Sequence, residues 1–534
     1  MSSSRSRRRG PALQRSIFTG MALCAVVSAD CAPRPIAISL GNVTISNQKV
    51  IRGLDISIGS PQQSLAFLPQ WSLNHTFVYG TNGFCNGYSS VACETYRGGR
   101  YDQFASQTAG RVSPGLTPND APPYPELSWV SEKVTLGKTV ALEQFPVGVA
   151  LSGWGNQGYH HQAAMGLGAN STMLRSLKSA GRIASRSWGM FWGRTGATKG
   201  SQLDGSVVLG GYDRAKVSGQ NYTYNLDNSN AECPTSMLVT VSAMTLNFAN
   251  GSAVSMFDGT ESLPFSACIV PDAPVLMTMP YEPTFRRFQN LTRAPYLGRS
   301  HGIYYYGMIY DNPESQIYTG DITITLNSEV AIRIPSDQLV VPDLTIDNMT
   351  GALMANASRM EVLLDPLIEN GKKGTLPRIG RQFLSSAYVM VNQDAGQFTL
   401  WSASPTARQD LVAIDSSNHV NSDFCREPSA PDSTAKTGAG SGSRRKISSG
   451  VIVGITIGVT VAVSCLGWLI FFCFMQRRNQ ARTKADTPRV ELEENARGYA
   501  PRPSISQAPR ELDGRRSVPG AVQPVELPAR TARD

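Results

Sequence analysis

The feature that most constrains this chain is an uncharged apolar run close to its C-terminal end. Residues 451–475 read VIVGITIGVTVAVSCLGWLIFFCFM, and a helix of roughly 20 apolar residues is long enough to cross a bilayer. A buried core helix is the alternative, but a surface that is apolar all round favours a membrane span. Arg477, Arg478, Arg482 and Lys484 follow directly, which is typical of a cytoplasmic flank. The sequence therefore predicts one transmembrane helix over residues 451–475.

The opposite end has the layout of a cleaved signal peptide. Five arginines in the first fifteen residues precede the apolar run Ile17–Ala29, and its last three residues are small enough for a cleavage site. An uncleaved anchor is the alternative, but this run is short for a membrane span. We therefore expect a signal peptide over residues 1–29. The chain would then be a single-pass type I protein of the plasma membrane or secretory pathway, with its body extracellular or luminal.

The net charge of +9 lies at the two ends of the chain. The leader and residues 444–446 are basic, and residues 477–534 carry twelve Lys and Arg against eight Asp and Glu. A net charge of about −3 remains for the rest of the chain. Because the basic residues flank the membrane rather than form one face, we expect no nucleic-acid partner.

Cysteines and glycosylation triplets agree with export. Six cysteines precede the predicted span and follow the leader, an even number that suits an oxidising compartment: Cys31, Cys85, Cys93, Cys233, Cys268 and Cys425. Fifteen pairings can be drawn, and only Cys85 with Cys93 is close enough in sequence to propose directly. Cys233 with Cys268 and Cys31 with Cys425 would then follow by elimination, although the sequence does not fix these two.

Eight Asn-x-Ser/Thr triplets lie in the same part of the chain and predict an exported glycoprotein. Their asparagines are Asn42, Asn74, Asn170, Asn221, Asn250, Asn290, Asn348 and Asn356.

The body of the chain has a β pattern. Segments 238–248, 321–334 and 386–403 alternate apolar and polar residues, as half-buried strands do. Helical periodicity is sparse and is best at residues 171–183. The sequence therefore predicts a mainly β fold.

Five segments, in order, resemble the pepsin-like aspartic protease family over roughly residues 50–404. They carry a Gly-x-Pro-x-Gln turn, a Gly-Leu-Gly stretch before a helix, a Gly-Gly-x-Asp stretch, the flanks of a second catalytic strand and a late Gly-x-x-Phe-Leu stretch, at residues 54–63, 163–183, 203–226, 266–280 and 376–404. The resemblance implies a bilobal fold with an active-site cleft between the lobes. The expected organisation is a signal peptide (1–29), an ectodomain (36–425, with lobes at about 36–222 and 223–425), a flexible stalk (426–450), the membrane helix (451–475) and a disordered cytoplasmic tail (476–534).

The catalytic residues that the family requires are missing. Its chemistry needs two facing aspartates, each in an Asp-Thr/Ser-Gly loop, which share one proton and activate a water. Counting from the turn at residues 58–61, the first aspartate falls at Gln70, followed by Trp71 and Ser72. The second position holds Pro271. Gln70 cannot accept a proton at neutral pH, and Pro271 has neither side-chain chemistry nor a backbone donor.

Asp272 lies one position after the second site. We expect it to be a solvated turn carboxylate rather than a displaced catalytic residue, and a lone carboxylate would in any case lack the second carboxylate of the catalytic pair. Gln70, Trp71, Ser72, Pro271 and Asp272 together are the candidate residues of the former cleft. The adjacent His160 and His161 would point to opposite faces of a strand, so we expect no metal site and no cofactor.

The preferred interpretation is therefore a non-catalytic surface binding or sensor protein. It would be anchored in the bilayer and would bind a peptide, protein or cell-surface ligand in the former cleft. One alternative is an active membrane-tethered aspartic endopeptidase that processes surface proteins, with Asp272 in an unfamiliar arrangement. Another places the function in the tail, where residues 502–506 and 515–519 put serines beside arginines, as basic-directed kinases prefer.

Overall fold

A computed structural model of the 534-residue chain describes residues 31–81, 90–113, 127–137, 140–150, 161–257, 259–260, 262–300, 302–303, 307–311, 317–367 and 375–425. The predicted signal peptide, stalk, transmembrane helix and tail lie outside these residues. Within these ranges, no helix combines the length and the apolar character that a membrane crossing requires.

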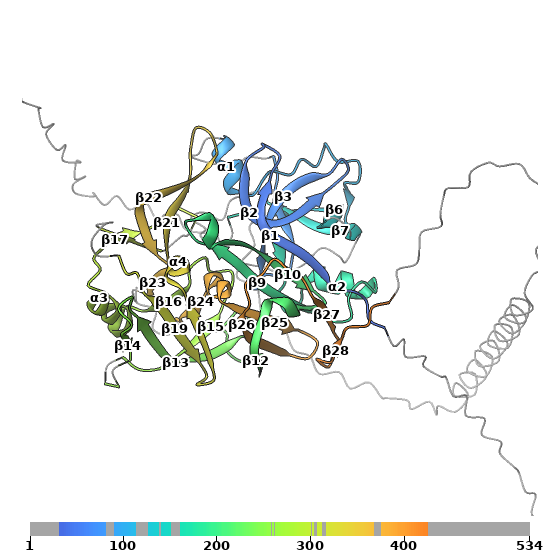
Figure 1. The fold of residues 1–534 in the computed structure, drawn as a ribbon. Coiled ribbons are helices and arrows are strands. Elements are labelled where there is room, and N and C mark those ends of the chain that lie inside the picture. Colours follow the sequence, from blue (N-terminus) through green and yellow to red (C-terminus); the bar gives the residue numbers. More distant parts are fainter. Residues whose placement is uncertain are drawn as a thin grey trace, which may run out of the picture. The chain divides into compact units, whose positions relative to one another are not determined.

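The body is mainly β, as the alternating pattern predicts, and its largest element is a 13-stranded sheet (Figure 1). The strand order is β12 (Val217–Asn225), β26 (Gln397–Ala403), β25 (Ala387–Asn392), β9 (Ser187–Thr195), β10 (Gln202–Leu209), β1 (Ile36–Thr44), β2 (Val50–Ile58), β3 (Gln63–Gln70), β8 (Ala163–Gly166), β4 (Phe77–Tyr79), β7 (Val140–Ala150), β6 (Leu127–Leu136) and β5 (Gly110–Arg111). Strands β25 and β26 come from the far end of the chain and pair with β9 and β12. The sheet therefore joins the first and last parts of the body.

Three smaller sheets complete the β structure. An 8-stranded sheet has the path β20 (Val330–Ile334), β19 (Asp321–Leu326), β13 (Leu238–Asn247), β15 (Phe265–Ile269), β24 (Arg378–Ile379), β16 (Met277–Pro280) and β23 (Leu364–Leu367), with β14 (Ala253–Ser255) on β13. A 4-stranded sheet runs β17 (Tyr296–Arg299), β18 (Met308–Tyr310), β22 (Leu353–Val362) and β21 (Val340–Ile346). A 3-stranded sheet runs β11 (Gly211–Asp213), β27 (Leu411–Ile414) and β28 (Val420–Asn421).

The helices in this part of the chain are short. They are α1 (Ser90–Tyr96), α2 (Thr172–Ser179), α3 (Arg286–Thr292) and α4 (Ser336–Leu339), with single turns at η1 (Lys199–Ser201), η2 (Arg214–Lys216), η3 (Tyr281–Phe285) and η4 (Arg381–Ser385). Helix α2 is the helix expected within residues 171–183. The Ser171 hydroxyl accepts a hydrogen bond from the backbone N–H of Leu174 at 3.2 Å, which is the cap that a helix start requires.

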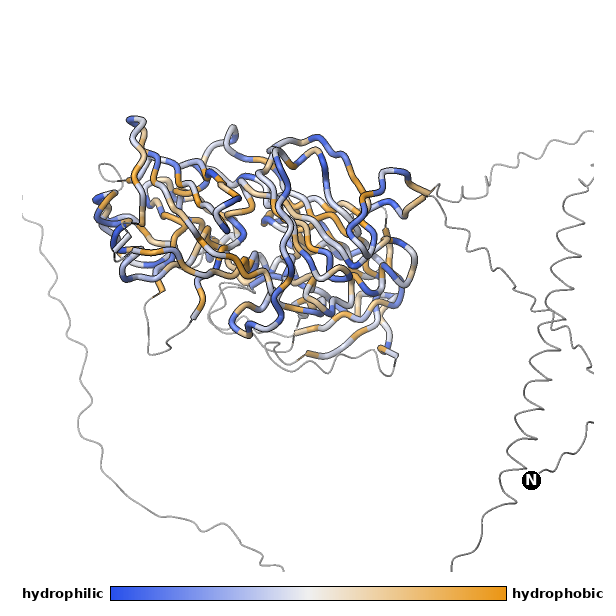
Figure 2. The backbone as a smooth tube through the Cα atoms, turned by 90° about the horizontal axis from the view of Figure 1, so that it is seen from below, coloured by the Kyte–Doolittle hydropathy of each residue, from blue (hydrophilic) through white to orange (hydrophobic). Residues whose placement is uncertain are grey.

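The core explains why alternation predicts the strands. In β19, Ile322, Ile324 and Leu326 are buried and the residues between them are half-buried, because successive side chains of a strand point to opposite faces. Figure 2 displays the mixture of apolar and polar residues along the strands. One apolar cluster contains residues of both the 13-stranded and the 8-stranded sheets. Full burial of one such side chain stabilises the fold by about 1.5–3 kcal/mol.

Two disulfides are present among the described cysteines. Cys31 and Cys425 join the two ends of the body, with their Cα atoms 4.8 Å apart, and Cys233 pairs with Cys268 beside Val270. These are the two pairings that elimination suggests. Cys93 is also disulfide-bonded, and Cys85, its expected partner, lies outside the described residues.

The sequon asparagines lie mostly at the surface. Seven are exposed and Asn74 is half-buried. The Asn74 side-chain oxygen accepts a hydrogen bond from the backbone N–H of Asn170 at 2.9 Å. Exposure makes seven of these side chains sterically accessible to a glycan.

Candidate functional site

Gln70 is the last residue of β3 and is completely buried. It lies opposite Gly166 of β8, and its carbonyl oxygen accepts a hydrogen bond from the backbone N–H of Leu167 at 2.7 Å. A side chain at Gly166 would place its Cβ 2.5 Å from the backbone nitrogen of His75, so only glycine permits this close approach. The local packing therefore encloses the first position at which the family resemblance expects an aspartate.

Pro271 and Asp272 lie in a tight turn directly after β15. The backbone N–H of Ala273 donates to the carbonyl of Val270 at 2.9 Å, and that of Arg381 donates to the carbonyl of Ala273 at 2.9 Å. Gly380 makes the second contact sterically permissible, because a Cβ there would lie 2.1 Å from the oxygen of Val275. This turn is buried throughout and is held against the start of η4.

Asp272 binds the backbone that follows Gln70. Its Oδ1 accepts a hydrogen bond from the backbone N–H of Trp71 at 2.7 Å. Its Oδ2 accepts one from the backbone N–H of Ser72 at 3.1 Å and another from the Ser72 hydroxyl. One carboxylate thus joins Asp272 to two residues that precede it by 201 and 200 positions in the sequence. We call Trp71, Ser72 and Asp272 the Asp272 junction.

The expectation of a solvated Asp272 is wrong, because only 2% of its surface is exposed. Asp272 does lie in a turn, as expected, but the backbone N–H groups of Trp71 and Ser72 replace water as the hydrogen-bond donors to its carboxylate. Burial raises the pKa of Asp272, and the three donated hydrogen bonds and the charge of Arg381 oppose that rise. No hydrogen bond joins Asp272 to a second carboxylate in the part of the chain that the structure describes.

The remaining candidate residues also lie in packed surroundings. Trp71 is buried and its ring packs on Trp188 with centroids 4.8 Å apart. His161 is buried and stacks on Tyr96 with centroids 5.0 Å apart, whereas His160 lies outside the described residues. Within the described ranges, no group of three or more His, Cys, Asp or Glu side chains is arranged to hold a metal ion.

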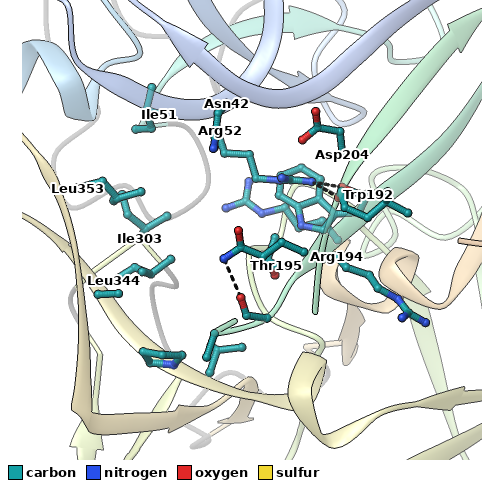
Figure 3. Close-up of a pocket in the computed structure, with 18 of the residues that line it drawn as sticks. Asn42, Ile51, Arg52, Trp192, Arg194, Thr195, Asp204, Ile303, Leu344 and Leu353 are labelled. Carbon is teal, nitrogen blue, oxygen red and sulfur yellow. Dashed lines mark hydrogen bonds between the residues drawn. The ribbon is translucent and has the colours of Figure 1, made fainter. Parts of the chain in front are cut away.

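A cavity of about 270 Å³ lies between the 13-stranded sheet and the 4-stranded sheet. We call it the inter-sheet cavity (Figure 3). Side chains from β1, β2, β3, β9 and β10 line one side, and β21, β22 and Ile303 line the other, with Arg381 of η4 also in the lining. None of the five candidate cleft residues is part of this lining. Leu68 is, and it shares a face of β3 with Gln70 because the two are two positions apart.

Two arginines flank one indole in the cavity wall. The guanidinium of Arg52 lies 5.3 Å from the ring centroid of Trp192 and that of Arg381 lies 4.9 Å from it. Arg52 also donates through Nη2 to the carbonyl oxygen of Trp192 at 2.6 Å. Arg381 is only 3% exposed. Cation–π contacts of this kind stabilise a desolvated guanidinium, so the wall can keep positive charge beside the cavity.

The other wall is the β21–β22 hairpin, whose tip contacts the first part of the chain. The Thr95 hydroxyl of α1 donates to the carbonyl oxygen of Gly351 at 2.8 Å. Gly351 has a φ of +67°, and a Cβ there would lie 2.5 Å from the Cγ1 of Val91. Ile346 packs against a buried cluster that contains Ile51. The hairpin therefore bridges the two sheets beside the cavity (Figure 1).

Sequence reasoning missed Arg52, Trp192 and Arg381. The available signal for the two arginines was a charged residue close to strand-forming apolar residues, as in VIRGLDISI and PRIGRQFL. That signal marks a residue with an unusual environment, but it does not say which distant residues meet.

Neither the family models nor the curated proteins contain a match to this chain.

Proposed function

We propose that this chain is a non-catalytic binding protein whose ligand occupies the inter-sheet cavity. It would be a type I single-pass membrane glycoprotein of the plasma membrane or secretory pathway, with a bilobal body similar to the pepsin-like aspartic proteases. The proposal depends mainly on which residues occupy three positions that matter for catalysis and on what they contact. Gln70 and Pro271 replace the two expected aspartates, and Asp272 uses both of its oxygens within the Asp272 junction.

The chemistry of peptide hydrolysis supports the proposal that this protein is not a protease. Two carboxylates close together cannot both ionise, so one serves as the acid and the other as the base for a shared water. An amide at Gln70 cannot take either role. Asp272 faces N–H and O–H donors of the neighbouring strand end, which is an arrangement suited to holding two segments together.

The inter-sheet cavity supports binding. Its volume of about 270 Å³ is close to the lower limit of small-ligand pockets, roughly 300 Å³. Its lining combines aliphatic side chains with polar and charged ones, among them Arg52, Asp204 and Arg381, which can orient a bound molecule. Seven sequon asparagines are exposed, and the six that lie outside the cavity lining are compatible with both a glycan and a ligand in the cavity.

A proteolysis assay tests the proposal against its alternative, the membrane-tethered endopeptidase. The purified full-length chain is incubated with a denatured protein substrate between pH 3 and pH 7, with and without pepstatin, and with pepsin as the positive control. We expect no cleavage above background. Cleavage that pepstatin inhibits and that Asp272→Asn abolishes would replace the binding proposal with the endopeptidase.

A further inference from the structure

We propose that an N-linked glycan on Asn42 covers the mouth of the inter-sheet cavity, so that occupancy of this one sequon decides whether a ligand can enter. This inference rests on the proposed function, because it concerns access to the ligand site of an exported glycoprotein. It depends on the position of Asn42, which belongs both to a sequon and to the cavity lining.

Asn42 lies where the inter-sheet cavity opens to solvent. It is a residue of β1 that lines the cavity and is also exposed, and a lining residue that water reaches marks the opening. Gln202 and Asp204 of β10 and Leu353 of β22 share both properties. The opening is therefore bordered by residues of both walls, and Asn42 belongs to its rim (Figure 3).

The register of β1 directs the Asn42 side chain to the face that carries the cavity. Asn42 lies opposite Arg52 of β2, and residues opposite each other in an antiparallel pair project to the same face. Arg52 also lines the cavity. Val43 is buried, whereas Asn42 and Thr44 on either side of it are exposed, because successive strand residues point to opposite faces. A glycan on Asn42 thus leaves the strand beside the cavity.

The Asn42 side chain is available for modification. Among the residues that the structure describes, none forms a hydrogen bond with its amide, whereas the side-chain oxygen of Asn74 accepts the backbone N–H of Asn170. N-glycosylation joins the Asn42 Nδ2 to the anomeric carbon of an oligosaccharide carried on a lipid diphosphate. The bond from that carbon to the diphosphate oxygen breaks, the lipid diphosphate leaves, and the amide nitrogen loses one proton.

The rim carries groups that suit a sugar. The carboxylate of Asp204 lies beside the β1 backbone, since a Cβ at Gly41 would be 2.6 Å from its Oδ1. A carboxylate accepts hydrogen bonds, and the amide of Gln202 both donates and accepts them, which matches the hydroxyl and acetamido groups of the first sugar. An N-glycan is bulky, and the cavity has a volume of only about 270 Å³. A glycan attached at the rim is therefore large relative to the space that it borders.

Asn42 differs in this respect from the other seven sequon asparagines, because none of them is part of the cavity lining. Asn356 follows Ala355, which does line the cavity, but successive strand residues point to opposite faces. We therefore expect the effect on access from Asn42 and not from the other sequons.

The first measurement is the occupancy of the sequon. The full-length chain is produced in a eukaryotic secretory host, and mass spectrometry of its peptides determines whether Asn42 carries a glycan. We expect that it does. An unmodified Asn42 would overturn the inference. If glycans were absent from all eight sequons, the proposed glycoprotein would fail as well, so the two failures are distinguishable.

The second measurement is access to the cavity. Leu344 is half-buried and lines the cavity on the β21 side, so the variant Leu344→Cys reports the entry of a charged maleimide. We expect labelling to be about tenfold faster when Thr44→Ala removes the sequon, because the bulky glycan no longer covers the opening. Equal labelling rates with and without Thr44→Ala would overturn the inference. The readout needs no ligand, so it is independent of the proposed binding activity.

A second way of removing the glycan guards against misfolding of the Thr44→Ala protein. Asn42→Gln keeps an amide but cannot be glycosylated, and it should accelerate the labelling of Leu344→Cys as Thr44→Ala does. Thermal unfolding of each variant is measured in parallel. Acceleration in only one of the two variants, or acceleration accompanied by a lower unfolding temperature in both, would count against a glycan that covers the opening.

Matched controls test whether the effect belongs to this sequon and to this cavity. Ser252→Ala removes the sequon of Asn250, which is exposed and lies outside the lining, and should leave the labelling of Leu344→Cys unchanged. Leu297→Cys is the reporter control, since Leu297 is 67% exposed and lies outside the lining, and it should react at one rate whether or not Asn42 is glycosylated. An acceleration by Ser252→Ala as large as that by Asn42→Gln would refute the assignment to Asn42.

Discussion

Replacement of Asp272 by alanine should separate a structural carboxylate from a catalytic one. The substitution removes the acceptor of three hydrogen bonds, from the N–H of Trp71, the N–H of Ser72 and the Ser72 hydroxyl. Trp71 is buried, so its N–H would be left without a partner away from water.

The magnitude follows from those groups. Leaving a buried donor unsatisfied costs about 1–3 kcal/mol, and the half-buried Ser72 loses less because water can reach it. We therefore expect a loss of about 3–5 kcal/mol in the free energy of unfolding, similar to the effect of breaking a buried ion pair. For a body of about 400 residues this lowers the unfolding temperature by roughly 5 °C. Asp272→Asn keeps one acceptor oxygen and should cost about half as much.

The assay is urea and thermal unfolding of the full-length chain at pH 7, followed by tryptophan fluorescence. Asp337→Ala, at an exposed position of α4, is the matched control and should stay within about 0.5 kcal/mol of the unmodified chain. An Asp272→Ala protein as stable as the Asp337→Ala protein would refute the junction. Loss of a measurable proteolytic activity at unchanged stability would instead make Asp272 a catalytic residue.

The other predictions concern pH, a disulfide and the hairpin tip. Burial raises the pKa of Asp365 to about 7, so the folded state holds this proton to a higher pH than the unfolded state does. The contribution of Asp365 to the free energy of unfolding is therefore complete below about pH 4 and is lost as the pH rises through 7. Asp365→Asn should reduce the slope of the unfolding free energy against pH in that range by up to about 1.4 kcal/mol per pH unit. An unchanged slope would contradict this assignment. The Cys31–Cys425 disulfide joins residues with a sequence separation of 394. Replacing both cysteines by serine should lower the free energy of unfolding in urea by up to about 5 kcal/mol. A double serine variant with unchanged stability would contradict this prediction. Gly351→Ala should destabilise the chain by about 1–3 kcal/mol, because φ is +67° and the new Cβ meets Val91, and calorimetry of the variant measures it.

The mainly β fold could be predicted because its signal is local. Apolar residues at every second position of β19 become its buried face, and Ser171 caps α2 as its residue type suggests. The partners of strands carry no such local signal. Pairing of β25 with β9 joins residues about 200 positions apart, and no spacing rule within either segment selects that partner.

For the candidate site, the sequence predicts only which catalytic residues are missing. The sequence places Gln70 and Pro271 at the expected catalytic positions, and residue identity alone excludes the acid–base pair. It does not reveal that Asp272 is buried, because a turn carboxylate looks the same whether water or a distant N–H group faces it. It also does not reveal the cavity, since Arg52, Trp192 and Arg381 come from three separate segments.

The sequence by itself determines which groups this chain can offer: strand-forming segments, six cysteines in the body and no aspartate at two expected positions. These properties depend on residue type and short-range periodicity. Only the tertiary structure decides which groups meet, and it brings Asp272 to Trp71 and Ser72 and places two arginines against one indole. The physical reason is that burial and hydrogen bonding are set by neighbours in space, and here those neighbours lie far apart along the chain.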